Sequence, residues 1–152
     1  LEERDVHCLL YQGRYNLFDR TPEEQGIFDC ISRSGVGFVA FSPLAQGLLT
    51  ARYLNGVPEG SRMAQEHFLK RDALTEGTLN KIKSLDKLAA GRGQTLAEMS
   101  LAWLLKDEHV SSVIIGASSV AQLDDNLRAL RHTDFEDEEL ARIEEICRRP
   151  DK

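Results

Sequence analysis

Three short runs of consecutive apolar residues constrain the fold of this chain more than any other feature. They span 6–12, 37–41 and 112–116, and helical patterns separate them. Strands that are apolar at every position are typical of parallel sheets that helices cover on the outside. The alternation therefore predicts an α/β architecture. A sheet of three strands leaves two open edges and one poorly covered face, so we expect this chain to be part of a larger α/β body.

The segments between and after these runs have helical spacing and helix-start signals. Thr95 and Glu98 match a capping box, and the residues that follow them are apolar almost all round. The expected helices run from Thr21 to near Gly35, from about Thr75 to Ala90, from Thr95 through Leu105, from Ser118 or Ser119 with Val120, Leu123, Leu127 and Leu130 on one stripe, and over a last segment carrying Leu140, Ile143 and Ile146. The stretch from Asn55 to Asp72 has no period and is predicted to be a long functional loop.

Composition bounds the class of protein. The 152 residues contain 19 Lys and Arg against 25 Asp and Glu, for a formal net charge of -6. This balance, with no basic block, argues against nucleic-acid binding. No apolar run approaches the roughly 18 residues of a membrane span. We therefore expect residues 1–152 to form one domain that contacts neither nucleic acid nor membrane.

Cysteine and histidine usage predicts neither a disulfide framework nor a metal site. Cys8, Cys30 and Cys147 are far apart, and the four histidines are scattered without ligand spacing. A reducing cytoplasm is the expected location. The chain shows no signal peptide and no initiator Met, and it opens a few residues before a strand, so we expect a chain that is truncated at its N-terminus.

The candidate ligand-binding segments follow the three predicted strands, because α/β folds bind ligands at the carboxyl ends of their strands. They read Gln12-Gly13-Arg14-Tyr15-Asn16, Ser42-Pro43-Leu44-Ala45-Gln46-Gly47 and Gly116-Ala117-Ser118-Ser119. Free amides and hydroxyls at a helix start form an anion pocket, although the serines there could serve only as caps.

In combination these segments resemble the aldo-keto reductase family. The matching motifs are Gln12-x-x-Tyr15-Asn16, Ser42-Pro43-Leu44-x-x-Gly47 and Gly116-Ala117-Ser118-x-x-x-Gln122-x-x-Asp125-Asn126. The nearest subgroup is that of bacterial glyceraldehyde 3-phosphate reductase-type aldehyde reductases, which are related to potassium channel beta subunits. The resemblance implies a (β/α)8 TIM barrel of which this chain is the C-terminal half, strands six to eight.

The resemblance also implies an NADP(H) site spread over these segments. Tyr15 would stack on the nicotinamide ring, its alternative being an ordinary core aromatic, and Gln12 would hold the carboxamide. The residues expected at the pyrophosphate are Ser42, Pro43, Leu44, Ala45, Gln46 and Arg52, those at the 2′-phosphate are Gly116, Ser118, Gln122 and Arg62, and those at the adenine are Asp125 and Asn126.

Several positions depart from the family pattern. Arg52 stands where Lys is more common, Asp125 where Glu is, and Gly13 where Pro usually follows the Gln. Many reductases have a cation where Gln122 stands, so the preference for NADP over NAD depends on Arg62.

The family's catalytic Asp, Tyr, Lys and His have no counterpart in this chain, so no catalytic residue is assigned. The leading interpretation is an NADPH-dependent aldehyde or ketone reductase for which this segment supplies much of the cofactor site. The alternatives are an NADPH-sensing regulatory subunit and an inactive half-barrel. We expect a small carbonyl substrate, and association either with copies of this chain or with the N-terminal half.

Overall fold

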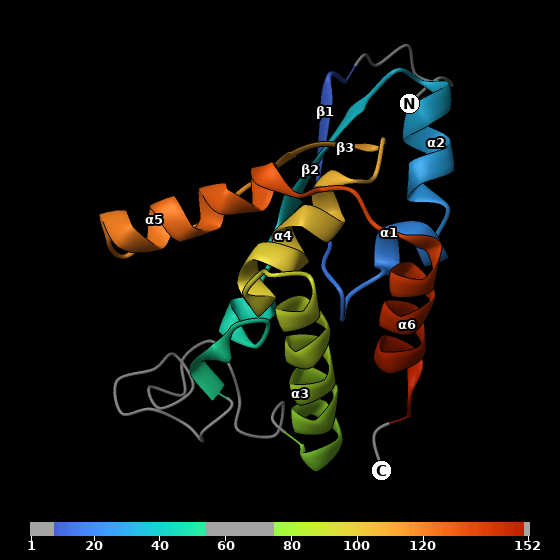
Figure 1. Ribbon diagram of the computed structural model, residues 1–152. Coiled ribbons are helices and arrows are strands. Elements are labelled where there is room, and N and C mark those ends of the chain that lie inside the picture. The colour runs from blue at the N-terminus through green and yellow to red at the C-terminus, as the bar shows by residue number, and fades with distance from the viewer. Residues whose placement is uncertain (1–7, 54–74, 151–152) are drawn as a thin grey trace.

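The computed structural model describes residues 8–53 and 75–150 (Figure 1). The predicted long loop after Asn55, Arg62 within it, and the first two residues of the predicted first strand lie outside this part. In chain order the elements, with 3-10 helices marked η, are β1 Leu10–Arg14, α1 Thr21–Glu24, α2 Ile27–Arg33, β2 Gly37–Phe41, η2 Ala45–Gly47, η3 Ala51–Tyr53, α3 Glu76–Gly91, α4 Leu96–Leu105, β3 Val110–Val113, α5 Val120–Leu127, η5 Arg128–Arg131 and α6 Asp137–Arg148.

The strands form one parallel sheet in the order β1-β2-β3. Leu10 pairs with Gly37 and Arg14 with Phe41, while the pairing of β2 with β3 has an irregularity after Phe38. Parallel neighbours need crossover connections, and helices lie in both crossovers. The predicted α/β alternation is confirmed.

The core lies on one face of this sheet. Phe38 and Ala40 of β2 are buried there, whereas Val39 and Phe41, which alternate with them, are partly exposed. The core residues that are at most 1% exposed include Tyr15, Leu17, Phe38, Ile82, Leu85, Leu96, Met99, Leu104 and Ile143. The prediction that the strands are buried on both faces is wrong, because the described helices cover one side: only Gly13 is buried in β1 and only Val110 in β3.

The helix-start signals were partly right. The capping box of Thr95 and Glu98 opens α4, and Ser119 rather than Ser118 is the N-cap of α5. The single helix expected after Thr21 is instead two, because Gly26 adopts the left-handed conformation (φ 66°) and breaks it. Thr21 is the first helical residue rather than the cap.

Helix α5 projects from the rest of the molecule (Figure 1). Its predicted apolar stripe is exposed: Val120 is 76% exposed, and Leu123, Leu127 and Leu130 are also open. The structure places α5 against α4 and η5, and these contacts leave the stripe without a cover within the described residues. None of the described helices is long and apolar enough to cross a membrane.

Candidate functional site

The carboxyl ends of the three strands lie at one edge of the sheet, because neighbouring strands are parallel. Each predicted ligand segment follows or includes one of these ends. β1 extends to Arg14, so Gln12 lies within the strand rather than after it. Its side chain is exposed on the face opposite the core.

The turn after β2 has an unusual backbone. Ser42, Ala45 and Gln46 all have positive φ, of 54°, 47° and 58°. Such conformations cost non-glycine residues on the order of 1–3 kcal/mol each and are often found at ligand clamps. The Ala45 amide donates to the Ser42 carbonyl at 3.0 Å, and Pro43 between them is buried. The segment from Ser42 to Gln46 is therefore a strained, well-defined turn at the expected edge.

Side chains at the start of α5 bond mainly to one another. The Gln122 Oε1 accepts from the Ser118 amide at 2.8 Å and from the Ser118 hydroxyl at 2.9 Å. Ser119 accepts from the Gln122 amide as the helix cap. Asp125 pairs with Arg128 at 2.9 Å, and Gly116 is exposed. Ser119 therefore serves as a helix cap, which was the alternative given for the serines at this helix start.

Two buried polar atoms in these segments have no hydrogen-bond partner among the described residues. They are the Gln46 Oε1, an acceptor, and the Asn126 Nδ2, a donor. Leaving such an atom unpaired costs about 1–3 kcal/mol. The two segments also meet one small apolar cluster, because Leu44 and Ile115 both pack against it.

Tyr15 lies in the core, which conflicts with the expected role in stacking on nicotinamide. It is 0% exposed and packs against Phe28, Phe38 and Trp103. Its hydroxyl donates to Glu23, and burial together with this carboxylate raises the pKa of Tyr15 above its usual value. Tyr15 is therefore an ordinary core aromatic, which was the alternative to the stacking role. It follows the last residue of β1, and its side chain lies on the core face of the sheet.

Two residues that the sequence analysis did not assign share the open face with Gln12. Arg14 lies two residues beyond Gln12 on β1, and its guanidinium carbon is 5.8 Å from the centre of the Phe41 ring. Phe41 is partly exposed and immediately precedes the strained turn. The period of two along a strand identifies both, but only once the strand ends are known.

The remaining predicted cations are less informative. Arg52 lies in η3 with an exposed side chain, and its amide donates to the Thr50 hydroxyl at 3.3 Å. Arg62 lies outside the described residues. Within the described ranges, no group of three or more His, Cys, Asp or Glu side chains could hold a metal ion.

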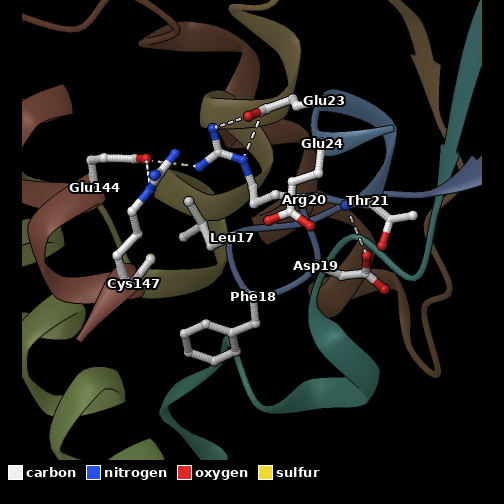
Figure 2. A pocket seen from close by; sticks show the side chains of 10 residues that line it. Leu17, Phe18, Asp19, Arg20, Thr21, Glu23, Glu24, Glu144 and Cys147 are labelled. Carbon is white, nitrogen blue, oxygen red and sulfur yellow. Dashed lines mark hydrogen bonds and ion pairs between the residues drawn. The ribbon is translucent and has the colours of Figure 1, made fainter. Parts of the chain in front are cut away.

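A cavity of about 430 Å³ lies elsewhere, between the segment after β1 and helix α6. Figure 2 shows Glu23 and Glu144 both pointing at Arg20 across it. The Arg20 guanidinium donates to Glu23 at 2.6 and 2.7 Å and to Glu144 at 3.1 Å, and it lies 4.4 Å from the Trp103 ring centre. Arg20, Glu23 and Glu144 in the cavity wall thus pair with one another, and none of the predicted cofactor residues lines the cavity.

A parallel sheet with its helices on one face, and with the predicted ligand segments at its carboxyl edge, defines this chain as an α/β protein of the kind that forms barrels. The chain belongs to the aldo/keto reductase family, whose model matches residues 1–148. A solved aldo-keto reductase from Bacillus halodurans, in its holo form, matches with a TM-score of 0.70 and 29% identity over 94% of this chain and 44% of that one. The fold class is therefore that of part of a (β/α)8 barrel, as predicted.

Curated relatives give the same family. L-glyceraldehyde 3-phosphate reductase of Escherichia coli O157:H7 is 47% identical over 149 residues, which is 95% of this chain and 43% of that protein. A probable voltage-gated potassium channel subunit beta of Oryza sativa subsp. japonica is 38% identical over 128 residues, 82% of this chain and 39% of that protein. The chain thus spans less than half the length of these relatives.

Proposed function

We propose that this chain forms much of the NADPH site of an aldo-keto reductase that reduces aldehydes or ketones. The observation that carries the proposal is the pair of buried, unpaired atoms, the Gln46 Oε1 and the Asn126 Nδ2. They come from the two segments expected to hold the cofactor, and a nucleotide offers both donors and acceptors. The strained turn from Ser42 to Gln46 supports a ligand clamp at the same edge.

Each segment is proposed to bind a different part of NADPH. The turn after β2, with Arg52, holds the pyrophosphate, and the start of α5 holds the adenosine end through Gly116, Ser118, Gln122, Asp125 and Asn126. Gln12 meets the nicotinamide carboxamide from the open sheet face. Phe41 replaces Tyr15 as the ring against the nicotinamide, because Phe41 is partly accessible while Tyr15 is enclosed.

The preference for NADP over NAD depends on Arg62 as the cation for the 2′-phosphate. Arg14 is a further exposed cation at the same sheet face. The bound cofactor would supply the hydride. No residue of this chain is a candidate for the acid that protonates the carbonyl oxygen. We therefore expect that acid in a part of the barrel that corresponds to the unmatched portion of the longer relatives.

We further propose that the chain is the C-terminal part of its barrel. Its open sheet face and the apolar stripe of α5 would then pack against the rest of the barrel. A second copy of this chain is the alternative occupant. The Escherichia coli reductase has more than twice the matched length, which leaves enough chain to complete a barrel.

A nucleotide-sensing subunit is the second candidate function. The likeness to a potassium channel beta subunit at 38% identity favours it over other non-enzymatic roles. The same residues would bind NADPH in either case. Turnover of an aldehyde by the complete protein separates the two functions, because a sensor needs binding and no catalytic acid.

Replacing Gln46 by Met tests the cofactor site with two readouts of opposite sign. The variant removes an unpaired buried acceptor, so it should unfold at higher urea concentration, with a gain of about 1 kcal/mol. The variant should also bind NADPH about tenfold more weakly in a fluorescence titration, because the acceptor that contacts the ligand is lost.

The control for this test is Gln25→Met, since Gln25 is exposed and outside the site. It should change neither quantity. Unchanged NADPH affinity in Gln46→Met would contradict the proposed site, and a loss of stability would show that Gln46 serves the fold instead.

A further inference from the structure

We propose that Asn16 is a positioning residue, which holds the turn from Ser42 to Gln46 in its strained conformation through one hydrogen bond. The turn lies 26 residues away in sequence, and the bond joins the segment after β1 to the segment after β2. The consequence for NADPH rests on the function proposed above, whereas the bond and its effect on the turn do not.

Asn16 is 2% exposed, and both ends of its side-chain amide are engaged. The Nδ2 donates to the Ser42 carbonyl at 3.0 Å. The Oδ1 accepts from the amides of Phe18 at 2.9 Å and Asp19 at 3.0 Å. One end of the amide therefore fixes its own turn, and the other end reaches the neighbouring strand's turn.

The side chain of Asn16 joins the segments after β1 and β2 beyond the last backbone hydrogen bond between them. The Tyr15 amide makes the last such bond, to the Phe41 carbonyl at 3.4 Å. The Asn16 backbone amide turns away to the Asp19 carbonyl, and Ser42 is the first residue after the end of β2. The Asn16 Nδ2 donates to the Ser42 carbonyl, so a side chain joins the two segments beyond their last backbone bond.

The Ser42 carbonyl is also the point on which the turn closes. It accepts the Ala45 amide at 3.0 Å as well as the Asn16 Nδ2. Ser42 has a left-handed φ of 54°, which a non-glycine residue leaves readily unless its surroundings hold it. The position of this carbonyl determines the path of the backbone through Ala45 and Gln46. Gln46 carries the unpaired acceptor of the site.

Asparagine suits this role because it is a donor and an acceptor in one short side chain. An ionised aspartate has almost the same shape but only accepts. Asn16→Asp therefore keeps the acceptor for the amides of Phe18 and Asp19, and it replaces the donor that faces the Ser42 carbonyl with a buried carboxylate oxygen. Asp19→Ala is the matched control, because Asp19 accepts from the Thr21 amide at 3.3 Å in the same turn without touching Ser42.

Amide hydrogen exchange of the 152-residue chain gives the decisive measurement. In N16D we expect the protection of the Ala45 amide to fall about tenfold, while the amides of Phe18 and Asp19 keep theirs. In D19A the protection of Ala45 should stay within about twofold of the original. Equal protection of Ala45 in N16D and the unchanged chain would overturn the proposal.

Loss of protection throughout α4 would show that N16D does not fold. Two further exchange measurements test the proposal in that case. The neutral variant Asn16→Ala should then lose protection at Ala45 while α4 keeps its own. In the unchanged chain, the side-chain amide protons of Asn16 should exchange slowly. Fast exchange of those protons, like that of a solvated amide, would overturn the proposal without any variant.

NADPH titration separates this inference from the proposed function. If the chain binds NADPH, N16D should weaken binding about tenfold and D19A should not. Equal affinity in N16D despite a loosened turn would overturn the positioning role. If the unchanged chain does not bind NADPH, the proposed function is wrong, while the exchange measurements still decide whether Asn16 holds the turn.

Discussion

Gly13 lies where β1 passes closest to the aromatic core. A Cβ added there would come within 2.8 Å of the Phe38 Cζ and 2.9 Å of its Cε2. Phe38 is fully buried, so its ring has little freedom to move. We expect Gly13→Ala to lower the free energy of unfolding by about 1–3 kcal/mol, measured by urea denaturation.

Gly91→Ala is the control for that measurement. Gly91 ends α3, and nothing lies within 4 Å of a Cβ added there. This substitution should raise stability by about 0.5–1 kcal/mol, because glycine is a poor helix residue. A Gly13→Ala variant as stable as the original chain would show that Phe38 can move aside.

Tyr15 and Asn16, which are neighbours in one motif, mark the limit of prediction at the scale of single residues. The motif that contains them identifies the edge of the sheet correctly. It cannot say which of them faces a ligand, because that depends on the exact residue at which β1 ends. The structure encloses Tyr15 among three aromatic rings and gives Asn16 the bond that crosses to the next turn.

Between elements, Arg92 joins the end of α3 to the start of α6. Its side chain is 2% exposed, pairs with Glu139, and donates to the Asp134 carbonyl at 2.7 Å. Its guanidinium carbon also lies 3.7 Å from the Phe135 ring centre. One planar group thus makes contacts in several directions, which the ammonium of lysine cannot reproduce.

We therefore expect Arg92→Lys to destabilise the chain by about 1–3 kcal/mol, because lysine cannot keep both the pair with Glu139 and the bond to the Asp134 carbonyl. Thermal and urea unfolding would measure this loss. Arg142→Lys is the matched control, since Arg142 pairs with Glu145 on the exposed side of α6, and it should cost less than about 1 kcal/mol. Similar losses in the two variants would show that Arg92 acts only as a surface charge.

The helices show what local sequence encodes well. The capping box of Thr95 and Glu98 opens α4, as predicted, since both partners lie within one turn. The break at Gly26 was not predicted, because a glycine within a helical pattern is often tolerated. The stripe of α5 has the correct spacing, yet spacing cannot say whether a partner covers it.

For the whole molecule, the open sheet face and the α5 stripe predict incomplete packing. Leu10, Ile114, Val120 and Leu127 are all at least 47% exposed. We expect the chain alone to self-associate in sedimentation experiments and to show no oxidation of NADPH with simple aldehydes. A monodisperse monomer that turns over aldehydes would contradict this, because it would need a catalytic acid within this chain.

Co-expression with the unmatched portion of the Escherichia coli reductase should give a complex that oxidises NADPH with aldehydes. Leu127→Glu should reduce the amount of partner that co-purifies, because it places a charge in the proposed contact. Lys83→Glu, on an exposed position of α3, should not. A stable complex that binds NADPH without turnover would favour the nucleotide-sensing function.

The sequence by itself determined the order of strands and helices, two of the helix caps, and the three segments at the carboxyl edge of the sheet. These features depend on residues that are close along the chain. The tertiary structure alone decided that Tyr15 is core, that Asn16 bridges two turns, and that one face of the sheet and one face of α5 stay open. Burial is decided by which distant segments pack together, and residue spacing carries no record of them.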